Sequence, residues 1–226
     1  PIYNSWIRRQ MKREKNSTVT SNYIDEKCLK SNKFYDFCDS YDGVILNNNV
    51  PYFRKADLML NCFQQYTLDK QGRCGAAFAC IGRECLPIKK REYIGSVIPT
   101  GWHSVKYDCI NGSFLYNRCH LIGFQLTGQN KNRKNIITGT RYFNTRQMLP
   151  FENLIVQYIK ETGNHVLYKV TPKFKEKNLL AHGVVMEAKS IEDNGRGICF
   201  NVYCYNIQAH ISIDYRTGDS KEIRHA

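Results

Sequence analysis

The sequence lacks several features that would restrict its fold and function. No apolar run approaches the ~18 residues of a membrane-spanning helix, so we expect a soluble protein. Ten cysteines are present, but no two of them form a C-x-x-C pair, which argues against a structural zinc knuckle. No segment repeats along the 226 residues, which argues against a repeat architecture.

Acidic residues are also scarce relative to basic ones. The chain has 20 acidic residues against 33 Lys and Arg, giving a formal net charge of +13 and a pI near 9.3. Such an excess favours a polyanionic partner, because each phosphate that a protein neutralises releases condensed counterions. A solvated basic surface and attraction to anionic membranes are the alternatives.

The cysteine count bears on the compartment. An even number of cysteines permits disulfides in an oxidising environment, and buried free thiols are the alternative interpretation. We take the count as favouring a secreted protein.

The composition divides the chain into two parts. Residues 1–41 are polar and basic, with the run "RRQMKREKNSTVTSN", and are predicted to be a poorly ordered arm. Residues 42–226 are predicted to form one folded domain, because short β-rich runs there alternate with Gly, Asn and Pro turns.

The predicted domain is of the α+β class. Two short strands are expected around the turn at 99–101, and a hairpin is expected to join strands at 102–108 and 114–122 through the Asn-Gly-Ser turn. One amphipathic helix begins near Pro150 and ends at Gly163, since apolar residues recur on one face at Phe151, Leu154, Ile155, Tyr158 and Ile159. Strand-like runs at 165–174, 179–190, 198–207 and 211–218 indicate a mostly antiparallel sheet, crossed by a hairpin–loop–helix insert.

The insert carries residues suited to phosphodiester hydrolysis, which needs a base, a hard cation and cationic groups. Arg118 and His120 lie on a predicted strand, Asn135 follows a basic loop, Asn144 begins a helical region, and Glu152 lies in the next helix's first turn. In a regular α-helix, eight residues turn by about 80° and rise ~12 Å. Asn144 and Glu152 are therefore expected to lie on one broad helix face, but not to coordinate the same ion directly.

Several motifs in fixed order carry a resemblance. "YNRCHLIGFQLTG", "KNIITGTRYFN" and "MLPFEN" resemble the DNA/RNA non-specific endonuclease family of the ββα-metal fold, most closely its secreted streptococcal and other Firmicute members. Further similar segments, such as "PTGWHSVKYD" and "VVMEAKSIEDNG", extend the resemblance over roughly residues 42–220.

The resemblance implies a role for each residue of the set. His120 matches the general base, Asn144 the single protein ligand of Mg²⁺, for which Mn²⁺ can substitute, and Glu152 the acid that hydrogen-bonds the metal's waters. Arg118 matches the arginine of the signature and Asn135 a structural asparagine. The implied activity is endonucleolytic cleavage of DNA and RNA that leaves 5′-phosphate ends.

Two positions depart from the family signature Asp-Arg-Gly-His. Asn117 replaces the Asp that orients the histidine, and Cys119 replaces the Gly. An Asn supplies hydrogen bonds but no charge, so either His120 is a weaker base or a backbone carbonyl orients it. A Cys119–His120 nucleophilic pair is disfavoured because neighbours on a strand point to opposite faces.

Basic residues near this set are candidates for nucleic-acid binding. Arg141 is predicted to clamp a phosphate oxygen, with a surface salt bridge as the alternative. Lys131, Arg133 and Lys134 lie between the base and the metal ligand and are predicted to contact the nucleic-acid backbone, although such runs are often only solvated.

The sequence thus predicts a Mg²⁺-dependent, sequence-non-specific endonuclease. Two other hypotheses stay open: a basic nucleic-acid-binding or uptake protein with weak or no catalysis, and a cysteine-rich secreted interaction domain. DNA-over-RNA preference and oligomeric state are not determined by the sequence.

Overall fold

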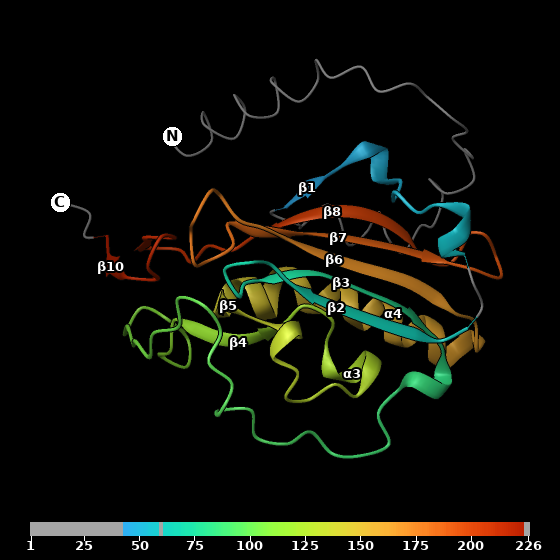
Figure 1. Cartoon of the computed structure of the whole chain (residues 1–226), viewed down its shortest axis with the longest axis horizontal. Helices are drawn as coiled ribbons and strands as arrows, with labels where there is room; N and C mark the ends of the chain where they lie inside the picture. Colours follow the sequence, from blue (N-terminus) through green and yellow to red (C-terminus); the bar gives the residue numbers. More distant parts are fainter. Residues whose placement is uncertain (1–42, 59–60, 224–226) are drawn as a thin grey trace.

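The computed structural model describes residues 43–58 and 61–223 (Figure 1). The predicted N-terminal arm, residues 1–41, lies outside the described residues. Within them, no helix has the length and apolar character needed to cross a membrane.

A six-stranded antiparallel sheet forms the centre of the fold, with strand order β1-β8-β7-β6-β3-β2. Its strands are β1 (Val44–Ile45), β2 (Phe63–Leu68), β3 (Cys74–Ile81), β6 (Val166–Lys173), β7 (Gly183–Ser190) and β8 (Cys199–Tyr205). Two separate two-stranded ribbons pair β4 (Tyr116–His120) with β5 (Ile136–Thr140) and β9 (Ile211–Ile213) with β10 (Ser220–Glu222). The predicted α+β class with a mostly antiparallel sheet is confirmed.

One long helix, α4 (Leu149–Thr162), covers a face of this sheet (Figure 1). Shorter helical segments are η2 (Asn47–Asn49), η3 (Lys55–Asp57), η4 (Arg83–Cys85), α3 (Phe124–Thr127), η5 (Arg133–Asn135) and the π-helix η6 (Phe143–Met148). The predicted helix is confirmed: Pro150 occupies its first turn, and Gly163 ends it in a left-handed conformation with φ 78°.

The main core lies between α4 and the sheet. Phe151, Ile155 and Ile159 present one face of α4 and are fully buried. Phe151 packs on Phe200 of β8, with 4.9 Å between ring centroids, and Tyr168 of β6 contacts the same ring. Burying each large apolar side chain contributes roughly 1.5–3 kcal/mol, so this face fixes α4 on the sheet.

The predicted hairpin between 102–108 and 114–122 is wrong. β4 pairs with β5, which follows the basic loop, and the earlier segment contributes only the isolated bridge between Lys106 and Phe114. The strands expected around 99–101 are also absent. The turn signal was genuine, since Gly112 and Ser113 have positive φ, but Ile136 and Ile137 of β5 are buried whereas 102–108 is largely exposed. Apolar burial therefore outweighed local alternation.

The π-helix η6 changes the relation between the two helical candidates of the active site. The Leu149 N–H bonds the Asn144 carbonyl, five residues earlier, so the chain turns through less than 100° per residue here. Asn144 and Glu152 are therefore separated by less than the about 80° of a regular α-helix.

Candidate active site

His120 is the last residue of β4 and is held by a backbone carbonyl. Its side chain is largely buried, and its Nε2 lies 2.9 Å from the carbonyl oxygen of Asn130. A carbonyl oxygen only accepts, so Nε2 carries the proton and Nδ1 is the nitrogen with a free lone pair. The imidazole is thus oriented with one basic nitrogen available.

The environment keeps His120 uncharged. Burial lowers the pKa of His120 below its ordinary value, the hydrogen bond to Asn130 opposes the shift, and the positive charge of Arg91 adds to it. A neutral imidazole is the form that can accept a proton, so the site favours a base at neutral pH.

Asn144 is hydrogen-bonded to Cys119, the residue that precedes His120. The Cys119 thiol donates a hydrogen bond to Asn144 Oδ1 at 3.0 Å and also contacts the Met148 sulfur at 3.6 Å. Cys119 is completely buried, and burial raises the pKa of its thiol well above the ordinary value, which disfavours the nucleophilic thiolate.

Glu152 is hydrogen-bonded to Gly123, three residues after His120. Its Oε1 accepts the Gly123 N–H at 2.7 Å, and its carboxylate lies so close to Gly123 that a side chain there would collide with it. Asn144 and Glu152, on consecutive helical segments, therefore both contact the stretch 119–123 that contains His120. The predicted metal ligand and acid therefore pack against the same short stretch of chain that carries the predicted base.

The donor set fits a divalent cation. Glu152 is buried and forms no ion pair with any described residue, and burial raises its pKa to about 8. The hydrogen bond from Gly123 and the charge of Arg91 only partly offset this effect. A carboxylate oxygen and an amide oxygen are ligands that Mg²⁺ prefers, and the amide oxygen of Asn144 has a second lone pair beyond the one that Cys119 uses.

Two asparagines of the predicted site behave differently. Asn135 is fully buried, its Oδ1 accepts from the Ile122 N–H at 2.9 Å, and its Nδ2 donates to the Ile122 carbonyl at 2.8 Å. These two bonds hold the turn after His120 against the end of the basic loop. Asn117 makes no side-chain hydrogen bond within the described part of the chain, so Asn130 supplies the orienting contact.

Arg118 of β4 is held by residues of the segment that precedes this strand. Its Nε donates to the Val97 carbonyl at 2.6 Å, and its guanidinium lies 4.1 Å from the Trp102 ring centroid. These contacts anchor the segment that precedes β4 and leave the terminal guanidinium nitrogens for other partners.

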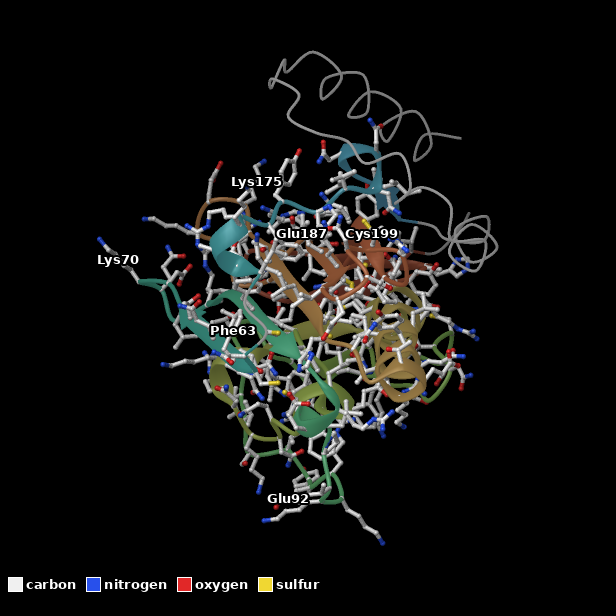
Figure 2. All side chains as sticks on the ribbon, turned by 90° about the vertical axis from the view of Figure 1, so that its right-hand side faces the viewer. Phe63, Lys70, Glu92, Lys175, Glu187 and Cys199 are labelled. Atoms are coloured by element: carbon white, nitrogen blue, oxygen red, sulfur yellow. The ribbon has the colours of Figure 1, made fainter. Side chains whose placement is uncertain are left out.

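The basic loop between β4 and β5 is partly engaged by the protein itself. Lys131 forms an ion pair with Glu92 at 3.3 Å, and Figure 2 shows Glu92 at the outer tip of the segment between η4 and β4. Arg133 donates to the Gly72 carbonyl at 3.0 Å. Lys134 is exposed and has no ion-pair partner in the described ranges.

Arg141 lies at the opposite end of the ribbon from His120. It follows Thr140, which pairs with Tyr116, and its guanidinium lies against Gly112. Four residues of strand, on the order of 13 Å, separate that end from His120. The structure does not bring Arg141 to the base.

Two residues near the site were missed by the sequence reasoning. Arg91 is the cation whose charge acts on both His120 and Glu152, yet its run "KKRE" was indistinguishable from a solvated one. Asn130 orients His120 through its backbone, and its buried carboxamide has no hydrogen-bond partner among the described residues. An unpartnered buried amide is costly, which marks it as a place for a water or substrate group.

Comparison with known proteins agrees with this geometry. A family model described as DNA/RNA non-specific endonuclease matches residues 57–192, more than half of the chain. The chain belongs to the DNA/RNA non-specific endonuclease family. The β4–loop–β5–η6–α4 unit is its ββα-metal motif, and the chain is a metal-dependent DNA/RNA endonuclease.

Solved structures of nucleases resemble this endonuclease. NucA from Streptococcus agalactiae without metal is 25% identical, with a TM-score of 0.71, covering 85% of this chain and 97% of NucA. The same protein with a magnesium ion bound gives a TM-score of 0.69 at the same identity and coverage. Sda1 nuclease with a bound zinc ion is 27% identical, with a TM-score of 0.58, covering 69% of this chain and 79% of Sda1.

Proposed function

We propose that this endonuclease is secreted and hydrolyses the phosphodiester bonds of DNA and RNA without sequence preference, using Mg²⁺, for which Mn²⁺ can substitute. The observation that carries the proposal is the convergence of Asn144 and Glu152 on the 119–123 segment around His120. The magnesium-bound structure of NucA supports the choice of metal.

His120 acts as the general base. The carbonyl of Asn130 holds Nε2–H, so Nδ1 faces the attacking water and takes its proton as the oxygen attacks phosphorus. Burial keeps the imidazole neutral before this step. The 3′ oxygen leaves and takes a proton from solvent, giving 5′-phosphate and 3′-hydroxyl ends.

Asn144 would hold the cation directly, and Glu152 would bind the cation's waters. When bound, the ion supplies positive charge to the scissile phosphate and leaving oxygen. Glu152 keeps its position through the Gly123 N–H. Arg91, with the exposed Lys134, favours the polyanionic substrate electrostatically.

Digestion of plasmid and of structured RNA tests this function. Wild-type protein is expected to cut both in Mg²⁺ and neither in EDTA, and His120→Ala is expected to lose at least 10²-fold in rate. His103→Ala is a matched control, because His103 is exposed and contacts Thr217 at 3.1 Å. Normal cleavage by His120→Ala would overturn the assignment of the base.

Asn117→Asp addresses the departure from the family signature. Because Asn117 has no side-chain hydrogen bond in the described ranges and Asn130 orients the base, we expect less than a threefold change in rate. Salt-sensitive binding without cleavage in any metal would instead support the hypothesis of a nucleic-acid-binding protein.

A further inference from the structure

A second cluster of potential metal ligands lies outside the active site, where three strand ends meet. Cys62 directly precedes β2, Glu84 and Cys85 belong to η4 just after β3, and His165 directly precedes β6. The register aligns these ends, since the neighbouring pairs are Phe63↔Cys80 and Ile81↔Val166. Figure 2 labels Phe63, the first residue of the edge strand β2.

The side chains of the cluster are in direct contact. The Cys85 thiol donates to Cys62 Sγ at 2.7 Å, and the Cys62 thiol donates to Glu84 Oε1 at 2.7 Å. His165 Nε2 lies 3.0 Å from the same Glu84 oxygen. The ligand atoms of Cys62, Glu84 and Cys85 all lie within 4.8 Å of one another.

His165 is oriented by a second carboxylate. Glu192 accepts from His165 Nδ1 at 2.6 Å and from the His165 backbone N–H at 2.8 Å. This leaves Nε2 directed at the cluster. Histidine ligands of zinc typically donate their other ring N–H to a carboxylate, which fixes the tautomer and increases the basicity of the ligating nitrogen.

We propose that Cys62, Glu84, Cys85 and His165 form a binding site for Zn²⁺ or a similar thiophilic divalent cation, with Glu192 orienting His165. Two sulfur, one nitrogen and one oxygen donor suit tetrahedral zinc rather than Mg²⁺. Binding releases the two thiol protons and the Nε2 proton to solvent.

Metal binding requires the four ligand side chains to rearrange. With Zn–S near 2.3 Å and Zn–N near 2.0 Å, tetrahedral ligand atoms lie about 3.3–3.8 Å apart. The observed contacts of 2.7–3.0 Å therefore open by about 1 Å, and Cys62 and Glu84 are exposed side chains that can move. His165 Nε2 contacts Glu84 but lies outside the group of ligand atoms within 4.8 Å of one another, so it moves towards the two sulfur atoms.

A disulfide between the two cysteines explains less of the arrangement. It would involve the sulfur atoms of Cys62 and Cys85 alone, at a spacing near 2.05 Å. The ion pairs of His165 with Glu84 and Glu192 would then be separate from the sulfur atoms, although Glu84 contacts both groups. A cation uses all four groups and cross-links β2 to the ends of β3 and β6.

Metal titration of the reduced, full-length protein tests the proposal. We expect wild type to bind one more equivalent of Zn²⁺ than Cys62→Ser/Cys85→Ser, and Co²⁺ to give thiolate-to-cobalt absorption only in the former. Cys109→Ser is the matched control, because Cys109 is an exposed free thiol outside the cluster and should bind like wild type.

Glu192→Gln supplies a second measurement that leaves all four ligands in place. Zinc affinity at this site is expected to fall 10–100-fold with unchanged stoichiometry. Equal zinc binding by wild type and the double cysteine variant, with correctly folded proteins by circular dichroism, would overturn the proposal, whether the two thiols are found free or joined. Plasmid cleavage is assayed separately, so loss of nuclease activity does not bear on this result.

Discussion

The buried carboxylate of Glu152 predicts a specific pH dependence of stability in metal-free protein. Burial raises its pKa from an ordinary 4.5 to about 8 in the folded state. The folded state therefore holds the proton more tightly than the unfolded state. The stability that this provides is fully present below about pH 4.5 and is lost as the pH rises towards 8.

The magnitude follows from proton linkage. Between pH 5 and pH 8 the free energy of unfolding is expected to fall by about 3 kcal/mol through Glu152 alone. Three full pH units at about 1.4 kcal/mol each would give about 4 kcal/mol. The expected fall is smaller because the carboxyl is still partly protonated in the unfolded state at pH 5 and already partly ionised in the folded state at pH 8. Glu152→Gln keeps the acceptor for the Gly123 N–H but cannot ionise, so it should lack this contribution.

Urea unfolding in EDTA at pH 5, 6, 7 and 8 measures the effect. The difference in unfolding free energy between wild type and Glu152→Gln should change by about 3 kcal/mol across the range, which cancels other titrating groups. Mg²⁺ should reduce the change, since a bound cation favours the charged carboxylate. If the difference between the two proteins stays constant from pH 5 to pH 8 within about 0.5 kcal/mol, which is about the precision of the method, the raised pKa of Glu152 in the metal-free folded state is refuted.

Three further predictions concern neighbouring residues. Arg91→Ala should weaken substrate binding several-fold and shift the acidic limb of the pH–rate profile to higher pH, because the charge of Arg91 lowers the pKa of His120. Lys90→Ala, at an exposed neighbouring position, is the control, and an acidic limb that does not shift would contradict the coupling. Cys119→Ala should lower the half-saturating Mg²⁺ concentration for cleavage, because it frees a lone pair of Asn144 Oδ1, and should cost about 1 kcal/mol of stability in urea unfolding. An unchanged Mg²⁺ dependence would show that the thiol does not compete with the cation for Asn144 Oδ1. Asn135→Ala should destabilise the fold by roughly 2–4 kcal/mol in urea unfolding, because it leaves both backbone groups of Ile122 unpaired in the interior; an unchanged unfolding free energy would contradict this role.

The helix and the larger strands were predictable because their signals are local. Phe151, Ile155 and Ile159 repeat with the period of one helix face, and Gly163 supplies the left-handed residue that ends it. The runs that became β6, β7 and β8 are rich in β-branched and aromatic residues. Their pairing order nevertheless depends on contacts between residues distant in sequence.

The hairpin was mispredicted because a turn signal does not specify a partner strand. Gly112 and Ser113 do form a tight turn, but β4 pairs with β5 across the 121–135 segment. β2, at the sheet edge, and β10 carry mostly exposed side chains, and neither was predicted. The local alternation of apolar and polar residues does not show how much apolar surface a strand buries by pairing with a segment distant in sequence.

The sequence by itself determined which residues are chemically capable: the ordered His120, Asn144 and Glu152, the basic charge, and the resemblance that unites them. Only the tertiary structure decided how they are held. The Asn130 carbonyl, rather than Asn117, orients the base, and Cys119 occupies a lone pair of Asn144. Contacts of this kind join residues on separate elements, so their geometry exists only once the core has packed.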